Sequence, residues 1–268
     1  MLKPLNPPIP SWAGQRIWIV GASRGIGAAL ARELSLQGAK LSLSGRHLAP
    51  LDPWLSTLPD AQRERIILSP LDVQQTEQLQ QTAQHLLQNW GGIDLVIVAA
   101  GVYDAIRAVD FDASHLPVVE QTLSINLAGP YRVAAVMLPI LRQQGGGHLS
   151  FISSVAGYNG LPRALAYAPS KAALNNLCEG LYFELSPLGI GISRICPGFV
   201  ATDMTASVDV AMPALIQPEQ ATQAILAGLA RGDFDIHFPR RFTYLLKILQ
   251  WLPRRCYFQL LRWGLAFS

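Results

Sequence analysis

Short apolar runs alternate with longer helical patterns along most of this sequence. The apolar runs predict strands at residues 16–21, 40–45, 65–71, 93–100, 147–153, 191–196 and 235–239. The segments between them predict helices near 25–37, 73–90, 115–143, 166–186 and 218–231. Runs such as LVIVAA (95–100) lack polar alternation, which is typical of strands buried on both faces of a parallel sheet. The alternation therefore predicts an α/β fold with one doubly wound parallel sheet of about seven strands and helices on both faces.

The composition and length fit one folded unit. Half of the 268 residues are hydrophobic, and a chain of this length can bury most of its apolar surface. No internal repeat, low-complexity segment or linker interrupts the alternation. We therefore expect a single domain over residues 1–268, with a core at about 15–240 and a C-terminal helical extension at about 241–268.

The sequence lacks signals for export, membrane insertion or metal binding. Its N-terminal segment is broken by prolines and has no apolar centre, so we expect no signal peptide. It has no uncharged apolar run of roughly 18 residues, the length that suggests a spanning helix. Three separated cysteines without a CxxC motif fit a reducing, cytoplasmic compartment. The five histidines are scattered, so we assign no metal site. We expect Cys178 and Cys196 in the core and His148 in a surface loop.

The first predicted strand is followed by a glycine-rich turn, GASRGIG, which contains Gly21, Gly25 and Gly27. Glycine has no Cβ and tolerates positive φ, so such a turn lets the backbone approach a pyrophosphate. The helix that follows directs its N-terminus at the same negative charge. Because the turn joins a predicted strand to a predicted helix, it indicates a dinucleotide-binding site. A purely structural turn is the alternative.

The G-x-x-x-G-x-G spacing resembles that of the short-chain dehydrogenase/reductase family, and further motifs follow in that family's order. They are LDV (71–73), VAAG (98–101), SINLAG (124–129), SSVAG (153–157), the pair Tyr167 and Lys171, and CPGFVATDM (196–204). At VAAG the chain departs from the family, because Val98 and Ala99 replace the usual asparagines. Only backbone contacts are implied there. The resemblance covers roughly residues 15–205 and implies a Rossmann-type, dinucleotide-binding catalytic domain.

The resemblance also implies which residues contact the cofactor. It places Asp72 at the adenine and Thr202 at the nicotinamide amide. The full expected set is Gly21, Ser23, Arg24, Gly25, Ile26, Gly27, Arg46, Asp72, Val73, Ala100, Gly101, Tyr167, Lys171, Pro197, Gly198, Val200 and Thr202.

The choice between NAD and NADP depends on the end of the second predicted strand. Enzymes that prefer NAD usually place an acidic residue there to bind the ribose 2′-hydroxyl. Here the strand ends with Gly45 and Arg46, and Arg24 lies in the glycine turn. Arginine binds phosphate through a rigid fork of donors, so we expect NADP(H). Two solvated surface arginines are the alternative.

Four residues are expected to carry the chemistry by the same resemblance: Asn126, Ser154, Tyr167 and Lys171. On a helix, Tyr167 and Lys171 share a face. A free phenol has a pKa of about 10, and a nearby ammonium lowers it, so Lys171 is expected to tune Tyr167 as the proton donor. Ser154 would hydrogen-bond the substrate oxygen, and Asn126 would belong to a water-linked proton relay. Alternatively, Ser154 caps the following loop and Asn126 satisfies a local backbone group.

The expected activity is that of an NADP(H)-dependent oxidoreductase that interconverts a ketone or aldehyde and its alcohol. The family's substrate lid corresponds to about 204–217, where Asp209 is the only charge, so we expect a small hydrophobic substrate. The resemblance also suggests a homodimer or homotetramer. A catalytically idle NADP-binding sensor or scaffold is the alternative, although an idle protein needs no complete catalytic set.

The C-terminal extension differs from the rest of the chain. Residues 236–268 contain six basic and no acidic residues, so this segment carries +6 and the remainder 3 − 6 = −3. That distribution is not typical of a nucleic-acid-binding protein. Pro253 separates two amphipathic segments, 242–252 and 254–267. Their polar stripes are Thr243, Lys247 and Gln250, and Arg255, Gln259 and Arg262.

Each segment of the extension also has an unusually broad apolar arc that something must cover. One alternative is protein, over the substrate pocket or at a subunit interface. The other is a peripheral membrane contact through 241–268, at the inner face of a membrane. In that case Trp251, Phe258 and Trp263 lie in the headgroup boundary and the arginines contact anionic lipid.

Overall fold

The computed structural model describes residues 3–206 and 212–264. Its centre is a seven-stranded sheet in the order β3-β2-β1-β4-β5-β6-β7, and each neighbouring pair is parallel. The strands are β1 (Arg16–Val20), β2 (Lys40–Gly45), β3 (Ile66–Pro70), β4 (Leu95–Val98), β5 (Gly147–Ile152), β6 (Ile190–Pro197) and β7 (Asp235–Phe238). The predicted fold class is confirmed, with small shifts at the strand ends.

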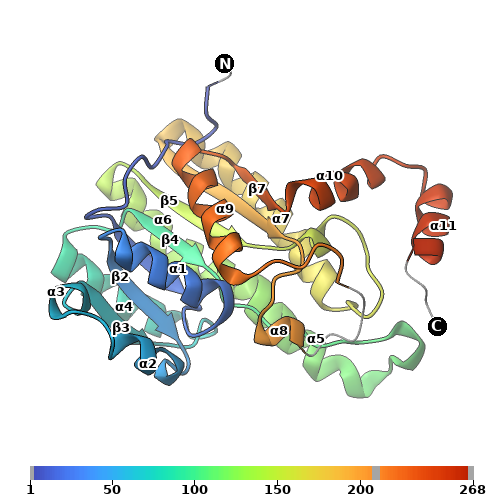
Figure 1. Cartoon of the computed structure of the whole chain (residues 1–268), viewed down its shortest axis with the longest axis horizontal. Coiled ribbons are helices and arrows are strands. Elements are labelled where there is room, and N and C mark those ends of the chain that lie inside the picture. The colour runs from blue at the N-terminus through green and yellow to red at the C-terminus, as the bar shows by residue number, and fades with distance from the viewer. Residues whose placement is uncertain (1–2, 207–211, 265–268) are drawn as a thin grey trace.

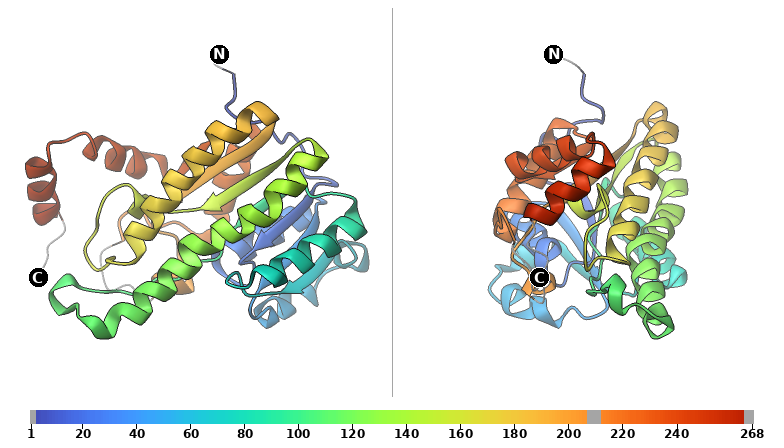
Figure 2. Two further views of the ribbon diagram at one scale, coloured as in Figure 1. Left: turned by 180° about the vertical axis from the view of Figure 1, so that it is seen from behind. Right: turned by 90° about the vertical axis from the view of Figure 1, so that its right-hand side faces the viewer.

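Helices cover both faces of this sheet (Figures 1 and 2). One face carries α1 (Gly25–Leu36) and α9 (Pro218–Arg231), and the other carries α4 (Thr76–Trp90), α6 (Gly129–Gln144) and α7 (Tyr167–Leu185). The remaining helices are α2 (Asp52–Leu55), α3 (Asp60–Arg63), α5 (Leu116–Leu123), α8 (Asp203–Ala206), α10 (Arg240–Leu249) and α11 (Arg254–Gly264). The last two project from the body beside β7 (Figure 1).

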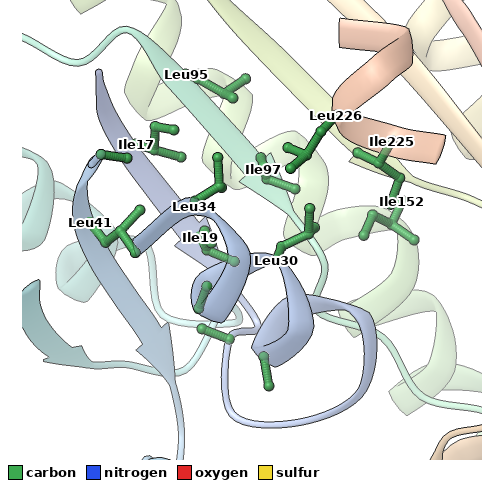
Figure 3. Packing of buried hydrophobic residues seen from close by; sticks show 14 of the residues in the cluster. Ile17, Ile19, Leu30, Leu34, Leu41, Leu95, Ile97, Ile152, Ile225 and Leu226 are labelled. Carbon is green, nitrogen blue, oxygen red and sulfur yellow. The ribbon is translucent and has the colours of Figure 1, made fainter. Parts of the chain in front are cut away.

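Alternate residues of the central strands enter two separate cores. Ile17 and Ile19 of β1 pack with Leu30 and Leu34 of α1 on one face, as Figure 3 shows. Trp18 of β1 points to the opposite face, because successive side chains of a strand alternate. Burial on both faces is the physical reason why these strands read as continuous apolar runs.

The helix expected over 115–143 is interrupted. It consists of α5, a π-helical turn (Ser124–Ala128) and α6. Together, Ala113–Gln144 form the one stretch of the described residues that is long and apolar enough to cross a membrane. Here Val133, Met137 and Leu141 are buried against the sheet, so the core accounts for its apolar face.

His148 does not lie in a surface loop, as we expected, but is buried inside β5. Its Nε2 lies 2.9 Å from the Ser193 hydroxyl of β6, and burial lowers its pKa to about 4. The preceding glycines suggest a loop, but the strand begins at Gly147. The ring fills the space beside Gly191, where a Cβ would overlap it.

This burial makes stability depend on pH. The folded pKa lies below the ordinary value of 6.5, so the unfolded chain binds more protons between about pH 6.5 and 4. The contribution of neutral His148 to the free energy of unfolding is therefore fully present above this window. It is lost as the pH falls through the window, by about 3 kcal/mol. Denaturant unfolding at several pH values should show that slope, and His148→Gln should reduce it.

The matched control for His148 is His85→Gln, because His85 is exposed on α4. This variant should keep the slope of the unchanged chain. Equal slopes for His148→Gln and the unchanged chain would contradict the assignment of the effect to His148.

Candidate active site

A cavity lies at the carboxyl ends of the strands, where the chain order reverses between β1 and β4. In doubly wound sheets this switch point is where ligands bind. The structure brings all of the expected cofactor-binding residues to this one cavity: Gly21, Ser23, Arg24, Gly25, Ile26, Gly27, Arg46, Asp72, Val73, Ala100, Gly101, Tyr167, Lys171, Pro197, Gly198, Val200 and Thr202. Of the expected catalytic residues, Ser154 also lines it, whereas Asn126 lies behind the wall.

The glycine turn is packed too tightly for side chains. Gly21 has a φ of +98°, and a Cβ there would overlap the backbone of Ala100 after β4. At Gly27 a Cβ would overlap the carbonyl oxygen of Gly21, so this glycine lets α1 pack directly on the turn. Gly25 has a φ of +56°, and a Cβ there would lie 3.2 Å from Thr202 Cγ2. These contacts explain the spacing of the three glycines.

The two arginines lie on the exposed rim of this cavity. Arg24 immediately precedes α1, and Arg46 immediately follows β2. Both residues are exposed. The end of β2 therefore presents positive charge and no carboxylate to a ligand in the cavity.

Asp72 lines the cavity but also stabilises its own turn. Its Oδ1 accepts a hydrogen bond from the backbone N–H of Gln74 at 3.0 Å. Its backbone N–H donates to Oε1 of Gln78 at 2.7 Å, which joins the turn to α4. This turn is why α4 starts at Thr76, later than expected.

Tyr167 and Lys171 start α7 and face the cavity together. The Lys171 ammonium lies 5.6 Å from the centre of the Tyr167 ring and donates a 2.9 Å hydrogen bond to the carbonyl oxygen of Ile152. Ser153, directly after β5, holds the same helix, because its hydroxyl donates to the carbonyl oxygen of Lys171 at 3.2 Å. The pair is thus fixed between α7 and the end of β5.

Ser154 has a capping role and a place beside the tyrosine. Its Oγ accepts a hydrogen bond from the backbone N–H of Ala156 at 3.1 Å, and it also forms a hydrogen bond with Tyr167. Ser154 can therefore cap the following loop and contact Tyr167 at the same time.

Asn126 is completely buried in the π-helical turn and ties it to the loop after β4. Its amide donates to the carbonyl oxygen of Val102 at 2.9 Å, and its Oδ1 accepts from the Val102 N–H at 2.8 Å. A Cβ added to Gly101 would lie 3.4 Å from Asn126 Oδ1 and 3.7 Å from Lys171 Nζ. Asn126 and Lys171 thus flank the same glycine, although the backbone contacts of Asn126 match the structural alternative.

Burial sets the protonation of the pair in this cavity. It raises the pKa of Tyr167 to about 12, although the hydrogen bond with Ser154 opposes the shift. It lowers the pKa of Lys171 to about 8. We expected Lys171 to lower the pKa of Tyr167, but desolvation of the phenolate outweighs any such effect here. The phenol is therefore protonated at neutral pH and can act as a proton donor.

The Pro-Gly turn after β6 is held by neighbouring backbone. The N–H of Gly198 donates to the carbonyl oxygen of Phe238 at 2.7 Å. Thr205 Oγ1 donates to the carbonyl oxygen of Val200 at 2.7 Å and accepts from the Thr202 N–H at 2.9 Å. These bonds fix the backbone of Thr202 beside Gly25. In the expected lid, Asp209 lies outside the described residues.

The sequence reading missed one aromatic neighbour of the tyrosine. Tyr103 follows β4, and its ring meets that of Tyr167 edge-on, with 5.2 Å between centroids and an interplanar angle of 87°. Its hydroxyl donates to the carbonyl oxygen of Arg163 at 3.3 Å. The only available signal was its position two residues after the VAAG motif. Cys178 and Cys196 are buried, as expected, and Cys256 is exposed.

Comparisons with known proteins agree with this geometry. A family model described as short chain dehydrogenase matches residues 15–212. An uncharacterized oxidoreductase of Myxococcus xanthus (strain DK1622) is 32% identical over 238 residues, which cover 88% of this chain and 91% of the relative.

Two solved structures share the fold. A short chain dehydrogenase from Burkholderia cenocepacia J2315, in complex with NADP, has a TM-score of 0.80 at 23% identity, and the match covers 94% of this chain and 99% of the other. A short chain dehydrogenase/reductase from Burkholderia phymatum, in complex with NAD, has a TM-score of 0.78 at 22% identity, with coverages of 89% and 94%.

The parallel sheet, the cavity at its switch point and the glycine turn define a nucleotide-binding protein of the Rossmann class. With the match over residues 15–212, the chain belongs to the short-chain dehydrogenase/reductase family and is an oxidoreductase.

Proposed function

We propose that this protein is an NADP(H)-dependent oxidoreductase that interconverts a small hydrophobic ketone or aldehyde and its alcohol. The observation that carries the proposal is one cavity that is lined both by the glycine turn and by Ser154, Tyr167 and Lys171. The oxidoreductase class follows from the family, whereas the cofactor preference, the substrate and the residue roles belong to the proposal.

The residues of the cavity fit a nicotinamide dinucleotide. Gly21, Gly25 and Gly27 leave backbone rather than side chains at the turn, and the N-terminus of α1 provides the positive end of a helix dipole. Arg24 and Arg46 would contact a 2′-phosphate, and Thr202 would hold the nicotinamide amide. When bound, the cofactor supplies the hydride for the carbonyl carbon or accepts it from the alcohol.

The chain itself supplies the proton and the charge stabilisation. In reduction, Tyr167 donates its phenolic proton to the substrate oxygen, and in oxidation the phenolate accepts it. Ser154 lies within hydrogen-bonding distance of Tyr167 and would donate to the same oxygen as negative charge develops there. Lys171, held by the carbonyl oxygen of Ile152, stabilises the phenolate that forms.

The proposed preference for NADP rests on the rim of the cavity. We expect NADPH to bind about 10–100-fold more tightly than NADH, because hydrogen bonds to charged groups contribute about 1.5–3 kcal/mol. Arg46→Glu should remove or reverse the difference. Titration of both cofactors into the unchanged chain and the variant, followed by fluorescence, measures it.

Arg142→Glu, at the end of α6, is a matched charge control for Arg46 and should keep the NADPH preference. Equal or tighter binding of NADH by the unchanged chain would contradict the proposal that the arginines at the rim of the cavity select NADP. Of the two Burkholderia proteins with this fold, one is in complex with NADP and the other with NAD.

A hydrophobic substrate is supported by the side chains beside the tyrosine. Ile152 and Val102 line the cavity, and Tyr103 packs on Tyr167. Loss of NADPH absorbance with a panel of apolar ketones and aldehydes, compared with sugar phosphates, tests this proposal. Cofactor binding without turnover on any of them would favour the idle sensor or scaffold instead.

The remaining assignments are also proposals. We propose one domain over residues 1–268, a cytoplasmic location and a homodimer or homotetramer.

A further inference from the structure

The polar side of α10 faces the body of the protein rather than solvent. Lys247 donates to Asp235 of β7 at 2.5 Å, and Asp235 also pairs with Arg194 of β6 at 3.3 Å. Burial opposes ionisation of Asp235, but these two cations outweigh it and lower its pKa. Thr243 is completely buried and lies 2.6 Å from Nδ1 of His237. Thr243 and Lys247, which belong to the polar stripe expected from the sequence, therefore make their polar contacts within the chain.

α11 is attached to the same side of the body, although Arg255 and Gln259 of its own polar stripe are exposed. Gln250, between the helices, donates to the carbonyl oxygen of Tyr158 at 2.6 Å. Arg254 donates to Asn159 at 2.9 Å, and the buried Tyr257 donates to the carbonyl oxygen of Gly160 at 3.4 Å. Polar and aromatic groups thus attach both helices to the loop that follows Ser154.

Because the polar side of α10 is turned inward, its apolar side is turned outward. Ile248 is 63% exposed and Trp251 is 89% exposed. With their neighbours they form what we call the outward tail face, made of Tyr244, Leu245, Ile248, Trp251, Phe258 and Leu260. Figures 1 and 2 show α10 and α11 standing away from the sheet. Single exposed apolar residues are ordinary, but six of them within residues 244–260 indicate an interaction surface.

The charges around this face select its partner. Residues 236–268 hold six basic and no acidic side chains, and the exposed Arg240, Arg241 and Arg255 belong to the two helices that carry the face. A second copy docked by two-fold symmetry would bring the same positive segments together, which is unfavourable. A partner with an apolar interior and a negatively charged boundary matches both the exposed apolar side chains and the basic residues around them.

We propose that the outward tail face binds the surface of a membrane that contains anionic lipid. The apolar side chains enter the headgroup boundary, with Trp251 as the most exposed of them, and the arginines contact lipid phosphates and carboxylates. α10 and α11 lie on the surface and do not span it. This inference concerns a separate surface and stands whether or not the proposed redox activity is correct.

Co-sedimentation of the full chain with vesicles tests the inference directly. At low salt, most of the protein should pellet with vesicles of phosphatidylcholine and phosphatidylserine, and little with phosphatidylcholine alone. Arg241→Gln with Arg255→Gln should weaken binding about tenfold to thirtyfold, because each basic residue contributes about 1 kcal/mol near an anionic surface. Ile248→Glu with Trp251→Glu should abolish pelleting. High salt should release the unchanged protein.

Phe183→Glu provides the matched control, because Phe183 is an equally exposed apolar residue (76%) far from the tail, on α7. It should pellet like the unchanged chain. Thermal melting shows whether each variant is folded, and the outward positions make loss of folding unexpected.

Three results would overturn the inference. The unchanged protein could stay in the supernatant with anionic vesicles at low salt, or pellet equally with neutral ones. The tail variants could pellet as well as Phe183→Glu does. Finally, sedimentation velocity without lipid could show that Ile248→Glu with Trp251→Glu dissociates an oligomer, in which case a second copy covers the face.

Discussion

Tyr167→Phe should reduce turnover by about 10²–10⁴-fold while cofactor affinity changes little. The variant removes only the phenolic oxygen, and a positioned general acid typically contributes that factor. The ring remains to pack edge-on against Tyr103, so the local aromatic contact is kept. Steady-state turnover with the best substrate of the carbonyl panel, together with titration of NADPH, separates the two quantities.

Tyr131→Phe is the control for Tyr167→Phe, since it removes the same atom from an exposed tyrosine on α6. It should retain full turnover. Turnover by Tyr167→Phe within a few-fold of the unchanged chain would refute the assignment of the proton donor, whatever the control shows.

Lys171→Ala should damage both cofactor binding and turnover. Loss of a charged hydrogen-bond donor costs about 1.5–3 kcal/mol, so we expect 10–100-fold weaker NADPH binding in addition to a large loss of turnover. In the unliganded protein the pKa of Lys171 is about 8, so the ammonium is lost as the pH rises through that value. Because kcat/KM reports the free enzyme, its alkaline decline near pH 8 should disappear in the variant.

The buried position of Lys171 requires two checks. Lys171→Met keeps more of the side-chain volume, and it should show the same losses as Lys171→Ala if the charge is responsible. Lys40→Ala, at the exposed start of β2, should leave binding, turnover and the pH profile unchanged. An alkaline limb that persists in Lys171→Met would show that another group titrates there.

The parts of the fold that the sequence predicted are those with strong local signals. Buried parallel strands read as apolar runs, and the glycine turn must lack side chains because Gly21 and Gly27 contact backbone. The positions of Tyr167 and Lys171 on one helix followed from their spacing, and both line the cavity.

Other features depend on contacts that are distant in the sequence. Tyr103 lies in the loop after β4 and Tyr167 begins α7, so nothing in either segment indicates that their rings meet. His148 follows glycines that suggest a loop, but pairing with β6 makes it part of a strand. The high pKa of Tyr167 depends on how deeply the cavity is buried, which the spacing of residues does not reveal.

In the C-terminal tail, the periodicity of the sequence predicted two helices with a polar side but not the direction in which that side points. The polar stripe of Thr243, Lys247 and Gln250 was visible in the sequence, but a stripe does not indicate which side faces the body. Apolar arcs usually face inward. Here the carboxylate of Asp235 and the carbonyl oxygen of Tyr158 provide partners for the polar side, so α10 turns its polar side toward the body.

This attachment has a practical consequence for engineering the chain. Phe242 of α10 packs on Gly198, in the turn beside the cavity, and Lys247 and Gln250 close a polar pocket over Arg194 and Asp235. Deleting the tail to improve solubility would therefore open that pocket and uncover the turn. A more soluble form of the enzyme should instead keep both helices and exchange only the outward apolar side chains for polar ones.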